Sequence, residues 1–430
     1  MSGHIARTQG LKAAYNFLWV KLFNPVGPGS AGFVYFFFGW LYRRFPQLVR
    51  MPGQIEVELT TVCDKKCIHC ENTMWDVRDQ PALNITFDEL KTMMDSIPKL
   101  KWASLVGEGS SFLNKDCMKM LRYLKERKVM VYQVDHLSDL TEEMIEELVD
   151  MKIDGMVVSF DAATKETYEA IKVGCKFDNV NTNIQRFLDM KKKKNSMLPE
   201  IVFGYTVMNN NVNEIPQFID HIADFAPRTD FGPGGRINFN RMLVFDDIKH
   251  LEQKEIPKEI IQKGSERAAA RKWFASFTGT NDLSDCPGPE MCMAWMEPYV
   301  MMKGLVMQCC AVFISNNRPQ LRKRAFGNLI ETPMKEIWNS KPYVQTRKLI
   351  NRSNQPIPLN CAGCRIFNTR PREEKYGVLD THSGRLMSQE EFVREYQGES
   401  MQMHYDLDIV DKRDANKSIP VEEGQKMNTE

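Results

Sequence analysis

Three cysteines, Cys63, Cys67 and Cys70, have the residue type and spacing best suited to chemistry in this 430-residue chain. Their C-x3-C-x2-C pattern follows an alternating apolar run at residues 55–59, which predicts a β-strand. Clustered cysteines in an intracellular chain are more often metal ligands than disulfide partners. Three thiolates on one short loop can hold a metal centre, but they leave one iron of a four-iron cluster open to an outside ligand. Zinc is the alternative, because the thiolates and His69 could complete a tetrahedral site.

A second group of cysteines lies in the last third of the chain, at Cys286, Cys292, Cys309, Cys310, Cys361 and Cys364. These thiols suffice for one cluster with four protein ligands but not for two. A zinc site built from two thiol pairs is the alternative. Cysteines grouped in this way are typical of metal sites in a reducing compartment, so we expect a cytoplasmic protein.

Short apolar runs alternate with helical segments from residue 54 onward, which indicates βαβ units and a parallel sheet. Six such units predict an α/β fold, a partial (β/α)6 TIM-like barrel with reactive groups at the carboxyl ends of its strands. The expected strands are Ile55–Leu59, Ala103–Val106, Val129–Val134, Gly155–Phe160, Ile201–Val207 and Ile237–Val244. The expected helices are Phe87–Ile97, Asp116–Arg127, Thr141–Asp150, Lys165–Ile171, Val180–Lys191 and Asn213–Phe225.

The loops after the second and fourth strands contain further candidate residues. The second strand runs into a glycine-containing loop, Gly107-Glu108-Gly109-Ser110, and glycine lets a backbone approach a ligand closely. The fourth strand ends with Ser159 and Asp161. After the third strand, Thr141 is expected to cap the following helix.

The cysteine motif after a first strand, the glycine pair and the V-S-F-D end of the fourth strand together resemble the radical S-adenosylmethionine (SAM) superfamily. The resemblance implies a 4Fe–4S cluster on the first three cysteines whose open iron binds the amino and carboxylate groups of SAM. The Gly107–Ser110 loop resembles the G-x-G-E-P loop that holds the methionine end of SAM, with Ser110 and Ser111 in place of the usual Glu and Pro. Ser159 and Asp161 would lie near the ribose of SAM.

The later cysteines resemble the SPASM extension of these enzymes, in a twitch-like version with a single auxiliary cluster. Cys292, Gly304 and Cys309 fit its opening, and the G-N-L, E-x-W and C-x2-C elements follow in the family's order. The two further cysteines of a full version are missing from residues 365–375. The resemblance implies one auxiliary 4Fe–4S cluster on Cys292, Cys309, Cys361 and Cys364. Cys310 could replace Cys309, and Cys286 is a spare or substitute ligand.

The resemblance further implies an enzyme, a radical SAM oxidoreductase or maturase. It would cleave SAM reductively to a 5′-deoxyadenosyl radical, with an electron from an external flavodoxin- or ferredoxin-like reductant, and abstract a substrate C–H hydrogen. The auxiliary cluster would aid oxidation or bond formation. Relatives mostly modify peptides or proteins, so a peptide or protein ranks first, ahead of a small-molecule, sugar or membrane-lipid-linked substrate. A non-catalytic zinc-binding protein is the alternative from another class. No catalytic acid or base can be identified.

The net charge of +1 argues against a nucleic-acid partner. Residues 11–45 combine apolar and aromatic side chains with basic ones in runs too short to span a bilayer. They predict either peripheral contact with the inner face of a membrane or packing against the main domain. The expected domains are an amphipathic segment (1–50), the barrel (51–250), a helical linker (251–285), the SPASM-like domain (286–370) and a polar tail (371–430).

Overall fold

The computed structural model describes residues 9–23, 40–41, 44–49, 51–75, 82–242, 246–278, 292, 294–310, 318–364 and 370–397. The six predicted strands are confirmed within one to three residues at each end. They are parallel neighbours in one sheet. Their bounds are β1 Gln54–Val57, β3 Trp102–Leu105, β4 Met130–Asp135, β5 Gly155–Ser159, β7 Glu200–Val207 and β8 Arg236–Arg241.

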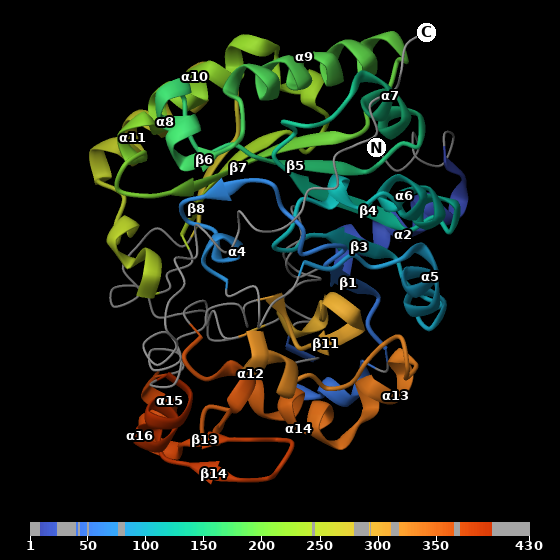
Figure 1. Cartoon of the computed structure of the whole chain (residues 1–430), viewed down its shortest axis with the longest axis vertical. Coiled ribbons are helices and arrows are strands. Elements are labelled where there is room, and N and C mark those ends of the chain that lie inside the picture. Colours follow the sequence, from blue (N-terminus) through green and yellow to red (C-terminus); the bar gives the residue numbers. More distant parts are fainter. Residues whose placement is uncertain are drawn as a thin grey trace, which may run out of the picture.

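The six predicted helices are confirmed as well, and each connects two successive strands or follows one of them. They are α5 Phe87–Asp95, α6 Cys117–Glu126, α7 Glu142–Asp150, α8 Lys165–Ile171, α9 Phe177–Lys193 and α10 Ile215–Phe225. Thr141 accepts a hydrogen bond from the Met144 amide and caps α7 as predicted. In Figure 1, α7 to α11 lie along the upper side of the sheet, opposite the orange and red C-terminal elements. The partial barrel predicted from the sequence is therefore the fold of this chain.

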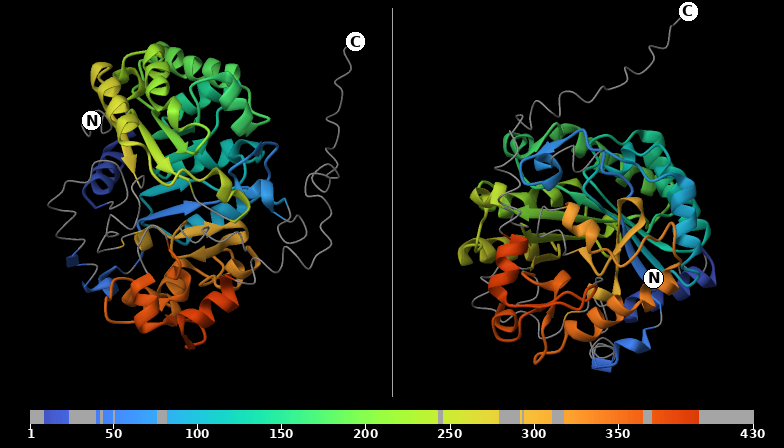
Figure 2. Two further views of the ribbon diagram at one scale, coloured as in Figure 1. Left: turned by 90° about the vertical axis from the view of Figure 1, so that its left-hand side faces the viewer. Right: turned by 60° about the horizontal axis from the view of Figure 1, so that its bottom comes forward.

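The sheet is larger than the six predicted strands. Its order is β11-β10-β1-β3-β4-β5-β7-β8-β9. Strand β9, Ala275–Thr278, follows helix α11, Lys258–Ala270, inside the range expected to be a helical linker. Strand β10, Tyr299–Met301, is parallel to β1, and β11, Leu305–Met307, returns antiparallel to β10. Residues from the expected SPASM-like range thus extend the barrel sheet beside β1, which Figure 2 shows in a second orientation.

The two faces of the sheet differ in accessibility. Outward-facing residues have no exposed surface and pack under the helices: Ile55, Val57, Ala103, Leu105, Met156, Val158, Ile201, Phe203, Ile237 and Phe239. The residues between them, on the inner face, are partly accessible: Glu56, Ser104, Val157, Ser159, Gly204, Thr206 and Asn238. Because side chains alternate along a strand, this pattern gives the barrel a packed outer face and an inner face that a ligand can reach.

Helix α2, Leu11–Phe23, covers the amino-terminal ends of the strands. Its Ala13, Ala14 and Phe17 pack against Trp102 and Met130, the first residues of β3 and β4. Asn16 Nδ2 donates to the carbonyl of Lys128, just before β4, at 2.7 Å. One of the two predictions for residues 11–45, packing against the main domain, therefore holds for this face of α2.

The C-terminal part forms a smaller unit beside β10 and β11 (Figure 1). Its elements are α12 Arg318–Lys323, α13 Met334–Asn339, α14 Lys341–Ile350, β12 Ile357–Pro358, α15 Arg370–Tyr376, β13 Val378–Leu379, β14 Leu386–Met387 and α16 Gln389–Phe392. Residues 370–397 differ from the expected polar tail, because Val378, Met387 and Phe392 pack with Leu359 in a buried cluster. These apolar residues are few and are separated by charged ones, so the composition of this range did not predict a packed unit.

Candidate active site

The first cysteine motif lies just beyond the carboxyl end of β1, as predicted. Cys67 ends the short strand β2, Lys66–Cys67, which pairs antiparallel with β6, Lys172–Val173. Cys70 directly precedes the one-turn helix α4, Glu71–Met74. The pairing with β6 ties the loop to the end of α8, so two distant segments fix the position of the thiols.

The three thiols of this motif are free and lie close enough to affect one another's pKa. Burial raises the pKa of the Cys63 thiol to about 11, and Cys67 adds to the rise. Burial also raises the pKa of Cys67, and it raises that of Cys70 together with Glu108, Cys67 and Cys63. Without a bound cation these thiols are neutral at physiological pH. Thiolate ligation by a cationic metal centre displaces their protons, so the donor set fits an iron–sulfur cluster.

Lys172 supplies the positive charge at this motif, and the sequence analysis did not single it out. The β2–β6 register places it opposite Cys67. Its Nζ lies 2.9 Å from Asp161 Oδ2 and donates to Ser159 Oγ at 2.8 Å. Lys172 lowers the pKa of Cys67, against the larger effect of burial. A lysine beside the Cys67 thiol favours its anionic form, although no local sequence pattern identified it.

Asp161 and Ser159, the predicted ribose contacts, lie at this site, but both interact with other groups of the protein. Asp161 has no exposed surface, and its Oδ1 accepts a hydrogen bond from the Thr206 amide at 2.7 Å. Burial raises the pKa of Asp161, but Lys172 and the other partners lower it below its ordinary value. The side chain therefore holds Lys172 and joins β5 to β7. A direct contact of either residue with SAM stays a prediction.

His69, considered as a zinc ligand, is buried between the motif and Asp161. Its Nε2 lies 3.8 Å from Asp161 Oδ2. Burial lowers the pKa of His69 to about 4, so the ring is neutral at physiological pH. Among the residues that the structure describes, no three His, Cys, Asp or Glu side chains lie close enough together to hold a single metal ion.

The glycine loop after β3 lies against the segment that leads to the cysteines. A Cβ atom on Gly109 would lie 2.4 Å from the Thr60 carbonyl oxygen, so only glycine fits. The Ser110 amide donates to the Val62 carbonyl at 2.9 Å. Glu108 Oε2 lies 3.8 Å from Cys70 Sγ. The predicted SAM-binding loop, Gly107 to Ser110, is thus adjacent to the motif, and the glycine requirement arises from the neighbouring backbone.

Four cysteines of the second group are brought together from three segments. Burial raises the pKa of Cys361, and the next contributions come from Cys309, Cys292 and Cys364. Asn351 fixes the first segment, because it accepts from the Cys292 amide at 2.8 Å and donates to its carbonyl at 2.9 Å. These are the four ligands that the resemblance implies for the auxiliary cluster, and because none of the four is in a disulfide they suit it chemically.

Cys310, the alternative ligand, faces a different neighbour. Burial raises its pKa, and the next contribution comes from Glu56 on β1. It does not appear among the groups that affect Cys361. This arrangement supports Cys309 rather than Cys310 as the ligand. Cys286 lies outside the described residues.

The other elements of the SPASM-like series have structural roles. Gly304 has a φ of 80°, and a Cβ atom there would lie 2.7 Å from Asn328 Oδ1. Its carbonyl accepts from the Leu329 amide at 2.7 Å. Trp338 Nε1 donates to the Val49 carbonyl at 2.7 Å, while Arg347 donates to the Trp338 carbonyl. These residues position the second cysteine group against the barrel.

The two cysteine groups lie toward opposite ends of β1. The first motif follows the carboxyl end of this strand. Met307 at the end of β11 is in register with Tyr299, which is in register with Glu56, so Cys309 lies toward the amino end of β1. The accessible inner face of the sheet extends between the two groups.

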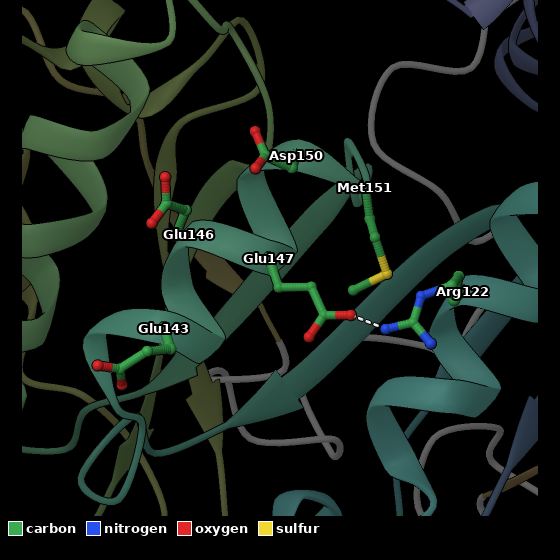
Figure 3. Close-up of a pocket in the computed structure, with 6 residues that line it drawn as sticks. All are labelled: Arg122, Glu143, Glu146, Glu147, Asp150 and Met151. Atoms are coloured by element: carbon green, nitrogen blue, oxygen red, sulfur yellow. Dashed lines mark hydrogen bonds and ion pairs between the residues drawn. The ribbon is translucent and has the colours of Figure 1, made fainter.

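One surface pocket lies on the outer side of the barrel, between α6 and α7. Its volume is about 420 Å³, and it is lined by Arg122, Glu143, Glu146, Glu147, Asp150 and Met151 (Figure 3). An ion pair joins Arg122 and Glu147. Glu143 and Asp150 point outward in this view, so the pocket is a charged surface depression. It is separate from both cysteine groups.

Comparison with known proteins defines the class. Residues 57–222 match the radical SAM superfamily, and residues 292–365 match an iron–sulfur cluster-binding domain, SPASM. The chain belongs to the radical SAM superfamily and has a SPASM domain; it is an enzyme that uses SAM and iron–sulfur clusters.

Individual relatives are distant. The chain is 28% identical to an AdoMet-dependent heme synthase of Methanosarcina barkeri, over 28% of this chain and 35% of that protein, so the match spans about a third of this relative. It is 18% identical to the tungsten-containing aldehyde ferredoxin oxidoreductase cofactor-modifying protein of Pyrococcus furiosus, over 71% of this chain and 86% of that protein. Streptococcus suis SuiB bound to the precursor peptide SuiA has a similar fold, with 12% identity and a TM-score of 0.56 over 74% of this chain and 70% of SuiB.

Proposed function

We propose that this enzyme uses SAM bound at Cys63, Cys67 and Cys70 to modify a peptide or protein, with an auxiliary cluster on Cys292, Cys309, Cys361 and Cys364. The observation that carries the proposal is the placement of two separate thiol groups on either side of an accessible inner sheet face. When bound, a SAM-ligated cluster supplies, on one-electron reduction, a 5′-deoxyadenosyl radical that abstracts hydrogen from a substrate C–H bond. A flavodoxin- or ferredoxin-like protein is the proposed reductant.

The chain's own residues prepare the first site in three ways. Lys172 places a positive charge beside Cys67 and is itself held by Asp161. The Gly107–Ser110 loop brings the Glu108 carboxylate next to Cys70 and bonds by its Ser110 amide to the Val62 carbonyl. Buried helix-facing side chains on the outer side of the sheet keep the strand ends in fixed register. Together these features hold the thiols, a loop for the methionine end of SAM and the accessible inner face in one arrangement.

A peptide or protein ranks first as substrate because SuiB, a protein of similar fold, is solved with a precursor peptide. A small-molecule, sugar or lipid-linked substrate ranks second. The two curated relatives, named for heme synthesis and for modification of an oxidoreductase cofactor, support keeping the small-molecule class as the alternative. The fold accommodates both classes, so the choice between them needs a direct measurement of the hydrogen donor.

Deuterium transfer identifies the substrate class even when the individual substrate is unidentified. Cells of the source organism are grown in deuterated medium, and their extract is separated into protein, peptide, small-molecule and lipid fractions. Each fraction is incubated with the reduced, iron-loaded enzyme and unlabelled SAM, and 5′-deoxyadenosine is analysed by mass spectrometry. We expect deuterium in 5′-deoxyadenosine from the peptide or protein fraction. Deuterium only from the small-molecule or lipid fraction contradicts the peptide proposal.

We also propose that the outer face of α2 contacts a membrane. Leu11, Tyr15 and Leu18 are 81%, 59% and 45% exposed, and they are spaced along one side of the helix. Lys12 and Lys21 lie on the same helix, and basic residues favour anionic lipid. No helix in the described part of the chain is long and apolar enough to cross a bilayer.

Liposome flotation tests this contact with a triple variant, Leu11→Ser, Tyr15→Ser and Leu18→Ser. Point changes are preferable to deletion of residues 1–50, because the inner face of α2 packs on Trp102 and Met130. We expect the wild-type protein to float with anionic vesicles and the variant to stay at the bottom. A matched control, Lys91→Ser on the exposed side of α5, should float like the wild type. Equal flotation of the triple variant contradicts membrane contact through α2.

A further inference from the structure

The inner face of β1 carries polar residues where the outer face is fully apolar. Ile55 and Val57 have no exposed surface and pack under the helices, whereas Gln54 and Glu56 alternate with them and point to the inner face. Glu56 is partly accessible there. The inner face lies between the two cysteine groups, so these side chains are placed where a substrate must pass.

Strand β10 brings a second carboxylate to this position. The Glu56 amide donates to the carbonyl of Pro298 at 3.0 Å, and Glu56 is in register with Tyr299. Glu297 directly precedes Pro298 and is therefore level with Gln54. Burial, and after it the charge of Glu56, raises the pKa of Glu297 to about 8, which is consistent with two carboxylates close together.

The two carboxylates have no cationic partner in the described part of the chain. Two other buried carboxylates do have one: Asp161 pairs with Lys172, and Asp154 pairs with Lys125. No ion pair among the described residues reaches Glu56 or Glu297. A buried pair of ionised carboxylates without a cation is costly, so Glu297, with its pKa raised to about 8, holds its proton at neutral pH. A positively charged ligand would stabilise the pair with both groups ionised.

Gln54 independently indicates a missing polar ligand. Its side chain is 1% exposed, and neither its Oε1 nor its Nε2 has a hydrogen-bond partner. Buried amide groups are almost always hydrogen-bonded, and leaving one without a partner destabilises the fold. The Gln54 side chain lies on the same face of β1 as Glu56. The β1–β10 register, extended by two residues, places Gln54 opposite Glu297. An amide oxygen beside two carboxylates is suited to a ligand that donates several hydrogen bonds.

We propose that Glu56, Glu297 and Gln54 form a subsite on the inner face of the barrel that binds an ammonium or guanidinium group of the substrate. The proposal rests on the proposed function, because it assumes that the substrate binds inside the barrel. It narrows the substrate class to peptides or small molecules with a basic group, because a neutral or anionic group leaves the carboxylate pair uncompensated.

Cys310 offers a reporter for this subsite. The residue as a whole is exposed, but burial raises its thiol pKa and Glu56 contributes next, so the thiol points inward beside the carboxylates. The anaerobic, iron-loaded full chain is treated with the neutral reagent methyl methanethiosulfonate. Modification of Cys310 is followed by peptide mass spectrometry, with Cys310→Ser to assign the signal. Butylammonium is the cationic probe, and butanol and butyrate are the neutral and anionic controls.

We expect butylammonium at twice its dissociation constant to slow modification of Cys310 about threefold by mass action. Butanol and butyrate should leave the rate unchanged, and Glu297→Gln or Glu56→Gln should remove the protection by butylammonium. Equal protection by all three probes, or no protection by any, overturns the subsite. SAM cleavage by the same wild-type preparation tests the proposed function separately, so the two failures are distinguishable.

Discussion

The two cysteine groups of this enzyme are built in opposite ways. The first is a short loop, Cys63 to Cys70, which follows the end of β1 and is held by one short pairing with β6. The second draws Cys292, Cys309, Cys361 and Cys364 from segments that span more than seventy residues of the chain. Their surroundings also differ in charge, since Lys172 lies beside the first group while Glu56 and Glu297 lie beside Cys310. The positions of Cys63, Cys67 and Cys70, the local group, therefore depend mainly on the geometry of neighbouring strands. The positions of Cys292, Cys309, Cys361 and Cys364, the distributed group, depend on packing between segments far apart in the sequence.

The largest expected effect concerns the identity of the distributed ligand. Cys309→Ala should lose about four irons and the auxiliary cluster, because this thiol lies with Cys361 and Cys292. Cys310→Ala, its matched neighbour, should keep the full iron content, because Cys310 faces Glu56. Iron analysis and electron paramagnetic resonance of the anaerobic proteins give the answer. Loss of iron from Cys310→Ala but not from Cys309→Ala reverses the assignment.

The next effect concerns the cation of the local group. Lys172→Met leaves Asp161 buried without its positive partner and should destabilise the protein by about 3–5 kcal/mol in urea unfolding. Lys165→Met, which breaks the exposed pair with Asp178 at the start of helix α8, should leave stability nearly unchanged. Similar losses in the two variants contradict the role given to Lys172.

The pH dependence of stability tests the same Asp161–Lys172 pair. The folded-state pKa of Asp161 is lower than its ordinary value, so its stabilising contribution is present at neutral pH and is lost as pH falls through that lowered pKa. Lys172→Met removes part of this effect. Urea unfolding of the wild type at decreasing pH should show a steeper loss of stability than that of the variant. Parallel curves contradict the pair's contribution.

A smaller effect is expected at the glycine loop. Gly109→Ala places a Cβ atom 2.4 Å from the Thr60 carbonyl oxygen and should destabilise the protein by about 1–3 kcal/mol. Gly204→Ala on β7 is the control, since its nearest atom would be 3.7 Å away, an ordinary contact. Thermal unfolding compares the two. If Gly109→Ala is as stable as Gly204→Ala, the loop has more room than the structure shows.

The sequence predicted much of this molecule because its strongest signals are local. Strand alternation and helix periodicity identified the six strands and six helices of the barrel, and the cysteine motif followed the strand expected for it. Strands β9, β10 and β11 were missed because each has only three or four residues and no clear flanking pattern. Pairing with β1 and β8, which is a long-range property, determines their structure.

Residues that act through distant contacts were also beyond reach of the sequence. Lys172 meets Cys67 only through the pairing of two two-residue strands. Glu56 and Glu297 lie more than two hundred residues apart, and only the β1–β10 register brings them together. The charge alternation on β1 was a usable signal, because Glu56 and Glu58 interrupt an otherwise apolar strand. It indicated an accessible inner face that the sequence analysis did not consider.

We propose that the two thiol groups hold separate clusters, one that cleaves SAM and one auxiliary cluster. Cys70→Ala and Cys361→Ala, purified anaerobically beside the wild type, test it through iron content and reductive SAM cleavage. The wild type should contain about eight irons, and each variant about four. Cys70→Ala should lose SAM cleavage, whereas Cys361→Ala should retain it. SAM cleavage that survives in Cys70→Ala, or a colourless wild-type protein that contains zinc and no iron, contradicts the claim.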